Sequence, residues 1–190
     1  MSRRFNITGT CIPERHYMVD ISDKINEIFK MVEQGDYFVI NRPRQYGKTT
    51  TIYLLNRLLK TTGDYFPINT SFEGIGEEGF DNAAVFIKAF FLLLNQEFKS
   101  SGNTDLMKFL ESRPIPDRID SLGVWISELV ETTGKKIVLI IDEIDKSSNN
   151  QLFLDFLGML RNKYLKRDEP GQPTFHSVIL AGVHDVKSLK

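Results

Sequence analysis

A glycine, a lysine and a threonine follow one another at positions 47 to 49, where a helix is expected to begin. Such a loop can bind phosphate, because backbone N–H groups at a helix N-terminus converge on phosphate oxygens. Gly47 would let the backbone approach closely, Lys48 would neutralise the β- and γ-phosphates of a nucleoside triphosphate, and Thr49 would offer its hydroxyl to Mg²⁺. The candidate nucleotide-binding residues are Arg42, Pro43, Arg44, Gln45, Tyr46, Gly47, Lys48, Thr49 and Thr50.

The full pattern of such a loop is G-x-x-x-x-G-K-[ST], and Arg42 stands where its first glycine belongs. The alternative is therefore a strand, a turn and a helix that contain an incidental Gly-Lys-Thr. Arg44 would add positive charge to the loop or would simply be solvated. The context favours nucleotide binding, because an apolar run at 37–40 precedes the loop and apolar residues at helical spacing follow it.

Two adjacent acids supply the second half of such a site. Asp142 and Glu143 directly follow the uninterrupted apolar run 137–141, which is typical of a strand covered on both faces of a parallel sheet. They therefore lie at the carboxyl end of that strand, where open α/β sheets bind ligands. Asp142 would hold Mg²⁺, and Glu143 would be the catalytic acid that orients the attacking water, with Lys48 stabilising charge. The alternative is an ordinary strand that ends in charged residues.

Strand patterns alternate with helical patterns along the chain, which predicts an open parallel sheet sandwiched by helices. We expect strands at 37–40, 68–72, 137–141 and 175–181. We expect helices from the cap Ser22 up to the stop at Gly35, from about Gly47 to Lys60, from the cap Asp81 to about Phe98, near Thr104 to Leu110, from about Ile119 up to Gly134 and from about Asn150 to Lys166. Pro67 favours a sheet edge for the second strand, because proline cannot donate to a ladder.

Composition excludes several classes of protein. The chain has 190 residues, 41% of them hydrophobic, and a formal net charge of -1, so the strongly basic balance typical of nucleic-acid-binding proteins is absent, although this leaves room for a local basic patch. Cys11 is the only cysteine, which excludes an intramolecular disulfide and a cysteine-rich zinc site. We find neither a membrane-spanning run nor a signal peptide and expect a cytoplasmic protein. We expect one nucleotide-binding domain over residues 1–190, the N-terminal part of a longer protein.

Other polar residues are weaker candidates. His184, after the last strand, could sense the γ-phosphate or could be a histidine at a strand-to-loop junction. Ser71 and Glu73 end the edge strand, where a polar side chain could hold Glu143 inactive until a partner binds. Asp145 is expected to be a surface charge at the start of the next loop, as is Lys146.

Two arginines near the end of the helix 150–166 could serve as an arginine finger for a neighbouring subunit, namely Arg161 and Arg167. The alternative, which we favour, is that cations stabilise the helix C-terminus through its dipole. The segment His16–Asp20 could line an adenine pocket or could be packing. Trp125 and most of the 14 phenylalanines stand at helical core spacing and are read as core.

Four segments together resemble the AAA-ATPase-like domain of bacterial and archaeal proteins, a group of additional-strand P-loop ATPases near the archaeal and signal-transduction branches. The segments are 41–50, 71–74, 140–145 and 180–182. The resemblance covers nearly the whole chain from about Arg4 and implies an α/β fold, a three-layer α/β/α P-loop NTPase sandwich with a parallel sheet. The implied strand order is second, third, fourth, first, with a fifth strand beyond the first that would lie past Lys190.

The same resemblance implies that an arginine at position 42 is a trait of the family. It also implies that Lys48 and Thr49 are nucleotide and Mg²⁺ ligands, that Asp142 is the acid on the metal side and that Glu143 is the catalytic acid. Members of the family often continue into a nuclease domain, and nothing in these 190 residues matches one. The preference for adenine rests on the resemblance alone.

Three functions are compatible with these features. The first is Mg²⁺-dependent ATP hydrolysis coupled to a conformational change, and Glu143 favours it. The second is an ATP-responsive switch that hydrolyses poorly and recruits a partner, either a protein or further copies of the chain. The third is a nucleic-acid-associated ATPase, which the near-neutral charge disfavours.

Overall fold

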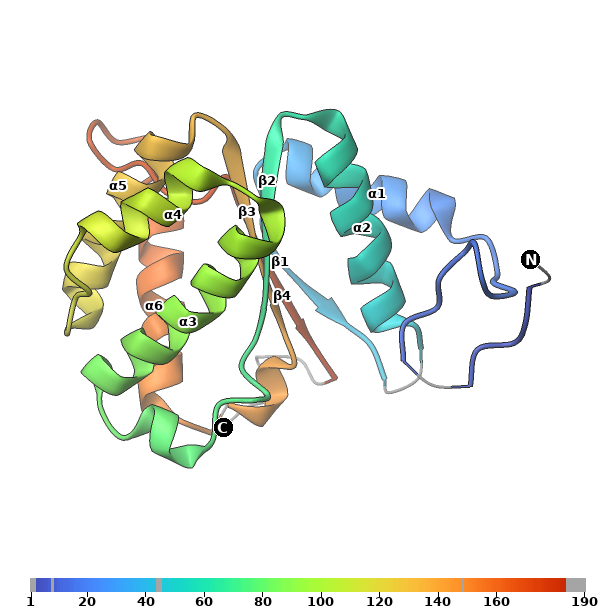
Figure 1. The fold of residues 1–190 in the computed structure, drawn as a ribbon, viewed down its shortest axis with the longest axis horizontal. Coiled ribbons are helices and arrows are strands. Elements are labelled where there is room, and N and C mark those ends of the chain that lie inside the picture. Colours follow the sequence, from blue (N-terminus) through green and yellow to red (C-terminus); the bar gives the residue numbers. More distant parts are fainter. Residues whose placement is uncertain (1–2, 8, 44–45, 148, 184–190) are drawn as a thin grey trace.

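Four parallel strands form one sheet within residues 3–7, 9–43, 46–147 and 149–183, which are the residues described by the computed structural model. The strands are β1 (Tyr37–Asn41), β2 (Tyr65–Ser71), β3 (Lys136–Asp142) and β4 (Ser177–Gly182), in the order β1-β4-β3-β2 (Figure 1). The predicted order of the four strands is therefore confirmed, and so is the position of Pro67 in an edge strand of the described sheet.

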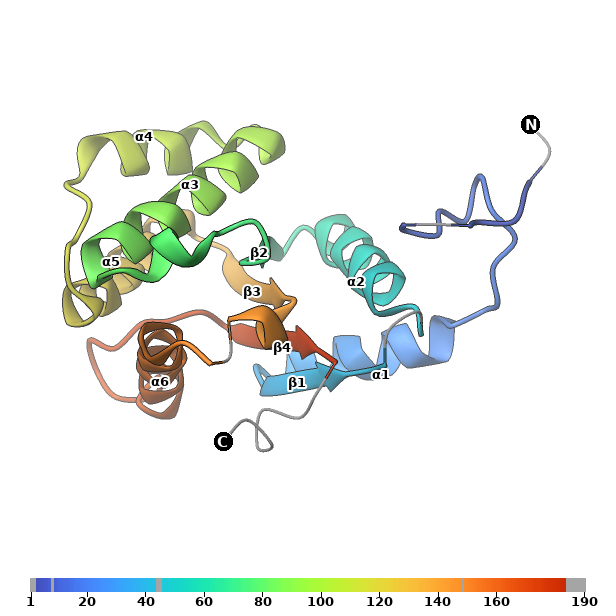
Figure 2. The same cartoon turned by 90° about the horizontal axis from the view of Figure 1, so that it is seen from below.

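Helices cover both faces of the sheet (Figures 1 and 2). They are α1 (Ser22–Glu33), α2 (Lys48–Thr62), α3 (Ala83–Ser101), α4 (Thr104–Ser112), α5 (Ile119–Thr133) and α6 (Gln151–Leu165), with short 3₁₀ turns η1 (Glu77–Phe80) and η2 (Ile144–Lys146). Helices α1 and α2 pack on one face, and α3 to α6 pack on the other. The predicted α/β/α sandwich is therefore what the structure shows. None of the helices in the described ranges is long and apolar enough to cross a bilayer.

Strand β3 joins the two halves of the core because its side chains alternate in direction. Ile137, Leu139 and Ile141 belong to the core beneath α3 to α6, whereas Val138 and Ile140 belong to the core beneath α1 and α2. All five side chains are fully buried, as expected for a central strand of a parallel sheet.

The carboxyl ends of the strands lie along one edge of the sheet, and the pairing places them level with one another. Asn41 of β1 pairs with Gly182 of β4, and Asp142 of β3 pairs with Ser71 of β2. The segments that follow these residues, including the start of α2 and the turn η2, are therefore brought together at this edge.

Two predicted caps differ from the observed ones. Asn82, not Asp81, precedes α3, and its side-chain oxygen accepts from the N–H of Val85 at 3.1 Å. At α1, the Asp20 carboxylate accepts from the N–H of Ser22 at 2.9 Å, so the serine is the first helical residue and not the cap. Asparagine and aspartate both accept well from free N–H groups near a helix start, which is why residue type alone left the position uncertain by one or two.

Candidate functional site

The loop between β1 and α2 presents the first turn of α2 at the strand-end edge. Gly47 precedes the helix with φ 76° and ψ 21°, a left-handed conformation in which a side chain would be strained. Apart from its chain neighbours and the backbone of α2, no atom of the described residues lies within 4 Å of the place that a Cβ would take. Glycine is therefore required here by backbone conformation, not by a lack of space.

Arg42 replaces the first glycine of the loop pattern and connects the two ends of the described loop. Its Nη1 donates a long hydrogen bond of 3.4 Å to the carbonyl of Tyr46, and its backbone N–H donates to the carbonyl of Gly182 at 3.1 Å. Tyr46 is largely exposed. Arg44 and Gln45 lie outside the described residues.

Lys48, the first residue of α2, is held between the two predicted acids. Its Nζ lies 2.6 Å from Glu143 Oε1 and 2.8 Å from Asp142 Oδ1. The Lys48 side chain is only 8% exposed, against 14% for Asp142 and 26% for Glu143. Burial alone would lower the pKa of Lys48, but the hydrogen bonds to Asp142 and Glu143 and the negative charges of these two acids together outweigh burial and raise this pKa. Two segments 95 residues apart thus meet in one charged cluster.

Glu143 adopts a backbone conformation that is unusual for a residue with a side chain. It lies just past β3 with φ 56° and ψ 40°, and it is the only non-glycine residue with positive φ in the described part of the chain. Its N–H donates to Asp142 Oδ1 at 2.8 Å, so the same carboxylate oxygen contacts both Lys48 and the Glu143 backbone. Such conformations are found most often at functional sites, where surrounding contacts hold them in place.

A cavity of about 640 Å³ opens over this cluster, and it is large enough for a nucleotide-sized ligand. It is lined by the loop before α2 together with Glu143, and by residues of the N-terminal segment. The residues that line the cavity include Phe5, Tyr17, Val19, Arg42, Gly47, Lys48, Thr49, Thr50, Glu73 and Glu143.

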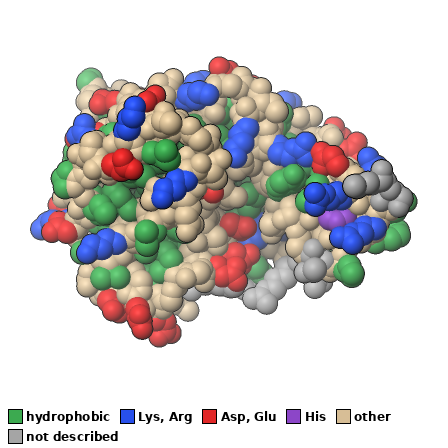
Figure 3. Space-filling view, in the orientation of Figure 1, with side chains coloured by type: hydrophobic (Ala, Val, Ile, Leu, Met, Phe, Trp, Pro, Cys, Tyr) green, Lys and Arg blue, Asp and Glu red, His purple; other side chains and the backbone are tan. Residues whose placement is uncertain are grey.

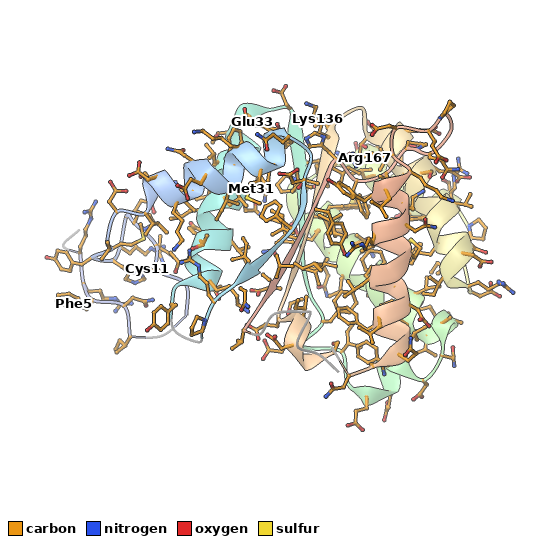
Figure 4. All side chains as sticks on the ribbon, turned by 180° about the vertical axis from the view of Figure 1, so that it is seen from behind. Phe5, Cys11, Met31, Glu33, Lys136 and Arg167 are labelled. Atoms are coloured by element: carbon orange, nitrogen blue, oxygen red, sulfur yellow. The ribbon has the colours of Figure 1, made fainter. Side chains whose placement is uncertain are left out.

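A hydrogen bond joins the N-terminal segment to the first turn of α2, and a backbone bridge closes the segment on itself. The N–H of Cys11 donates to Thr50 Oγ1 at 3.1 Å, and Arg4 bridges to His16. Figure 4 shows Phe5 and Cys11 on this side of α2. His16 is buried and its Nδ1 accepts from the N–H of Ile12, so it has a structural role, whereas Tyr17 lines the cavity.

Thr49 and Asp142 could hold a divalent cation. Both line a second cavity of about 310 Å³ next to the first, and Thr49 lines the first cavity as well. Hydroxyl and carboxylate oxygens are the hard ligands that Mg²⁺ accepts, usually together with phosphate oxygens. The donor set at this position therefore fits Mg²⁺.

Comparison with known proteins identifies the family of the chain. A family model described as a predicted AAA-ATPase, the AAA-ATPase-like family, matches residues 12–189. The chain belongs to this family. The predicted membership is confirmed. The matched region includes Arg42, which stands where the loop pattern has its first glycine.

Among solved structures, the chain resembles that of the ORC2 protein of Aeropyrum pernix in ADPNP–ADP complexes. The TM-score is 0.50 and the sequence identity is 12%. The match covers 87% of this chain and 40% of ORC2, so the chain spans less than half the length of that protein. At this identity the likeness concerns the fold alone. A search of the curated proteins gave no match.

The remaining predicted residues of the AAA-ATPase-like chain are spread over the fold. Ser71 Oγ accepts from the N–H of Glu73 at 3.3 Å, and Glu73 lines the larger cavity together with Glu143. Arg161 is exposed on α6. Arg167 donates to the carbonyl of Tyr164 at 2.9 Å, and its guanidinium lies 4.0 Å from the centre of the Tyr164 ring.

Arg167 also lies near Lys136, the first residue of β3 (Figure 4). Lys48 opens α2 just after the carboxyl end of β1, which is the opposite end of the sheet. Arg167 therefore cannot reach the site of its own chain, and a role at a neighbouring subunit stays a prediction, as it does for Arg161. His184 lies outside the described residues.

Asp145 was predicted to be a surface charge, and that interpretation is wrong. Its Oδ2 accepts from the N–H of Val183 at 2.5 Å, which ties the turn after Glu143 to the end of β4. The signal that could have revealed the contact is Gly182, since a glycine at the end of a strand often marks a close approach by another segment.

Proposed function

We propose that the chain binds ATP with Mg²⁺ at the larger cavity and hydrolyses it. The observation that carries the proposal is the position of Lys48, which opens a helix behind a left-handed glycine and contacts both acids at the end of β3. Phosphoryl transfer requires placement and charge stabilisation more than covalent chemistry, and these groups supply both.

Each residue has a role that follows from its chemistry. The N–H groups at the start of α2 and the ammonium group of Lys48 bind the β- and γ-phosphates. Thr49 and Asp142 hold Mg²⁺, which when bound neutralises charge on the phosphates. Glu143 orients and polarises the attacking water.

The base of the nucleotide would lie toward the N-terminal segment. Phe5 and Tyr17 line that end of the cavity with ring centres 5.1 Å apart, and both are largely exposed. Exposed aromatic rings offer surfaces on which a flat base can stack. Adenine is the proposed base, in keeping with the ADPNP–ADP complexes named for ORC2.

Coupling to a conformational change follows from competition for one cation. Lys48 Nζ lies 2.6 and 2.8 Å from the two acids, so phosphate oxygens in the cavity would compete with these carboxylates for the same ammonium group. In this proposal a bound triphosphate draws Lys48 away from Glu143, which releases the Glu143 carboxylate to contact water. The same competition supports the second candidate function, an ATP-responsive switch with little hydrolysis.

The two candidates differ in turnover. ATP hydrolysis should be compared for the wild type and Glu143→Gln, and MgATP and MgGTP binding measured by calorimetry for both. Hydrolysis predicts that Glu143→Gln binds MgATP but loses turnover by about 100-fold or more. Equal and very slow turnover in both proteins, with intact binding, would favour the switch. No heat signal with either nucleotide would refute nucleotide binding.

Partners and location remain proposals. Further copies of the chain or another protein could be the partner of either function. A nucleic-acid-associated ATPase stays the least supported alternative, because on the face shown in Figure 3 basic and acidic side chains are interspersed and no continuous basic patch is seen. The cytoplasmic location and the single domain over residues 1–190 stay predictions.

A further inference from the structure

We infer that Asp145 is a positioning residue, which acts through the Gly182–Val183 peptide to keep the Glu143 turn in register with the phosphate loop. Asp145 does not line the cavity and is therefore not assigned a contact with substrate. The catalytic consequence of this inference rests on the proposed function, whereas the structural link does not.

The link consists of two hydrogen bonds to one peptide group. The N–H of Val183 donates to Asp145 Oδ2 at 2.5 Å, and the carbonyl of Gly182 accepts from the N–H of Arg42 at 3.1 Å. This carbonyl and this N–H are the two ends of the peptide unit that joins Gly182 to Val183. Hydrogen bonds in such a chain polarise one another, and the one to a carboxylate is of the stronger, charge-assisted kind. The start of the phosphate loop is thereby joined to the turn that follows Glu143.

Gly182 is the residue that permits this approach. A Cβ at this position would lie 2.8 Å from Ile144 Cγ1 and 2.9 and 3.0 Å from the two carboxylate oxygens of Asp145. Distances below about 3 Å require atoms to move, because side chains in a packed core have little free space. A side chain at position 182 would therefore push the turn η2 away from β4 and break the contact.

Glu143 needs neighbours that hold it, because its left-handed backbone conformation is unfavourable for a residue with a Cβ. On its C-terminal side, Ile144 is 1% exposed and is anchored in the core, and Asp145 is anchored on β4. On its N-terminal side, Asp142 accepts from the N–H of Glu143. Removal of the Asp145 contact would leave the turn free to relax toward an ordinary conformation and to redirect the Glu143 side chain.

The test compares Asp145→Ala and Asp145→Asn with the wild type, and uses Asp155→Ala as a control. Asp155 is an exposed aspartate on α6 that accepts from Gln151 within its own helix. Asparagine retains an oxygen that can accept from Val183, so it should restore most of what alanine loses. In Asp145→Ala we expect hydrogen exchange of the Val183 amide to accelerate by about tenfold or more. We expect kcat to fall by about 10- to 100-fold while MgATP affinity stays within about threefold.

The outcomes separate this inference from the proposed function. Val183 exchange unchanged in Asp145→Ala would overturn the structural link, whatever the turnover. Faster exchange with wild-type kcat would overturn the positioning role. A wild type that binds but does not hydrolyse MgATP would refute the proposed hydrolysis. In that case hydrogen exchange at the Val183, Arg42 and Glu143 amides tests the positioning role of Asp145. Faster exchange at all three amides in Asp145→Ala, reversed in Asp145→Asn, would support this role. Faster exchange at none of them would overturn it.

Discussion

Replacement of Lys48 by methionine tests the charged cluster directly, because methionine keeps most of the side-chain volume and removes the charge. Each ion pair at 2.6–2.8 Å corresponds to roughly 6 kcal/mol of attraction at an effective dielectric constant of about 20, most of which desolvation cancels. Exposed pairs contribute about 0–1 kcal/mol and breaking buried ones costs about 3–5 kcal/mol. With acids that are 14% and 26% exposed, we expect a loss of about 2 kcal/mol, or about 4–8 °C in Tm.

The pH dependence has a definite sign. The pKa of Lys48 is raised in the folded protein, so its stabilising contribution is fully present below the unfolded lysine pKa of about 10.4 and is lost as pH rises through the higher folded value. The difference in the free energy of unfolding between wild type and Lys48→Met should therefore be constant from about pH 7 to pH 10 and shrink above that range.

Affinity for MgATP should fall by about tenfold in the same variant. A charge-assisted hydrogen bond is worth about 1.5–3 kcal/mol, and we expect the lower value because Lys48 exchanges contacts with acids for contacts with phosphate. Urea unfolding measures the effect on stability, and calorimetry measures the effect on MgATP affinity. The control is Lys108→Met, at an exposed lysine on α4, whose free energy of unfolding is expected within about 0.5 kcal/mol of the wild type. A stability difference at pH 7 as small as that of the control, or one that grows at alkaline pH, would refute the reasoning.

Three further changes test the fold. Lys163 is buried, donates a hydrogen bond to the Ser127 hydroxyl, and has a pKa that burial lowers. The free energy of unfolding of the wild type should therefore rise with pH between that lowered pKa and the unfolded lysine pKa of about 10.4. Lys163→Met should unfold at a higher urea concentration than the wild type at pH 7 and should lack this rise with pH. Asn82→Ala should cost about 1 kcal/mol in urea unfolding through loss of the hydrogen bond to Val85. Leu55→Ala, at a fully buried position of α2, should cost about 2–5 kcal/mol by the same assay, and a value below that of Asn82→Ala would contradict the observed core.

Sequence patterns were sufficient for the parts of the fold that depend on local order. Apolar periodicity located the helices, and the unbroken run 137–141 located the central strand, because these signals arise within one segment. The pairing of Lys48 with the two acids could also be anticipated, since parallel strands end at the same edge of the sheet. The distances of 2.8 and 2.6 Å in the structure show that these segments meet.

Irregular segments were not predictable in the same way. The contact between Asp145 and Val183 joins residues 38 positions apart, and that between Cys11 and Thr50 joins residues 39 apart. In a turn without periodicity, the direction of a side chain is set by whatever long-range contact is available. The left-handed conformation of Glu143 belongs to the same group, because glutamate has no preference for it and neighbouring contacts impose it.

The phosphate loop reaches Glu143 by two separate routes, and both bear on how binding could be coupled to chemistry. One route runs through side chains, from Lys48 to the Glu143 carboxylate at 2.6 Å. The other runs through the backbone, from the N–H of Arg42 across the Gly182–Val183 peptide to Asp145. A displacement of the loop that lengthens the first contact without breaking the second would change the charge around Glu143 while keeping its backbone in place. In the proposed function Glu143 activates water, which requires a rigid turn with a released carboxylate, so the proposal predicts that the backbone route survives nucleotide binding.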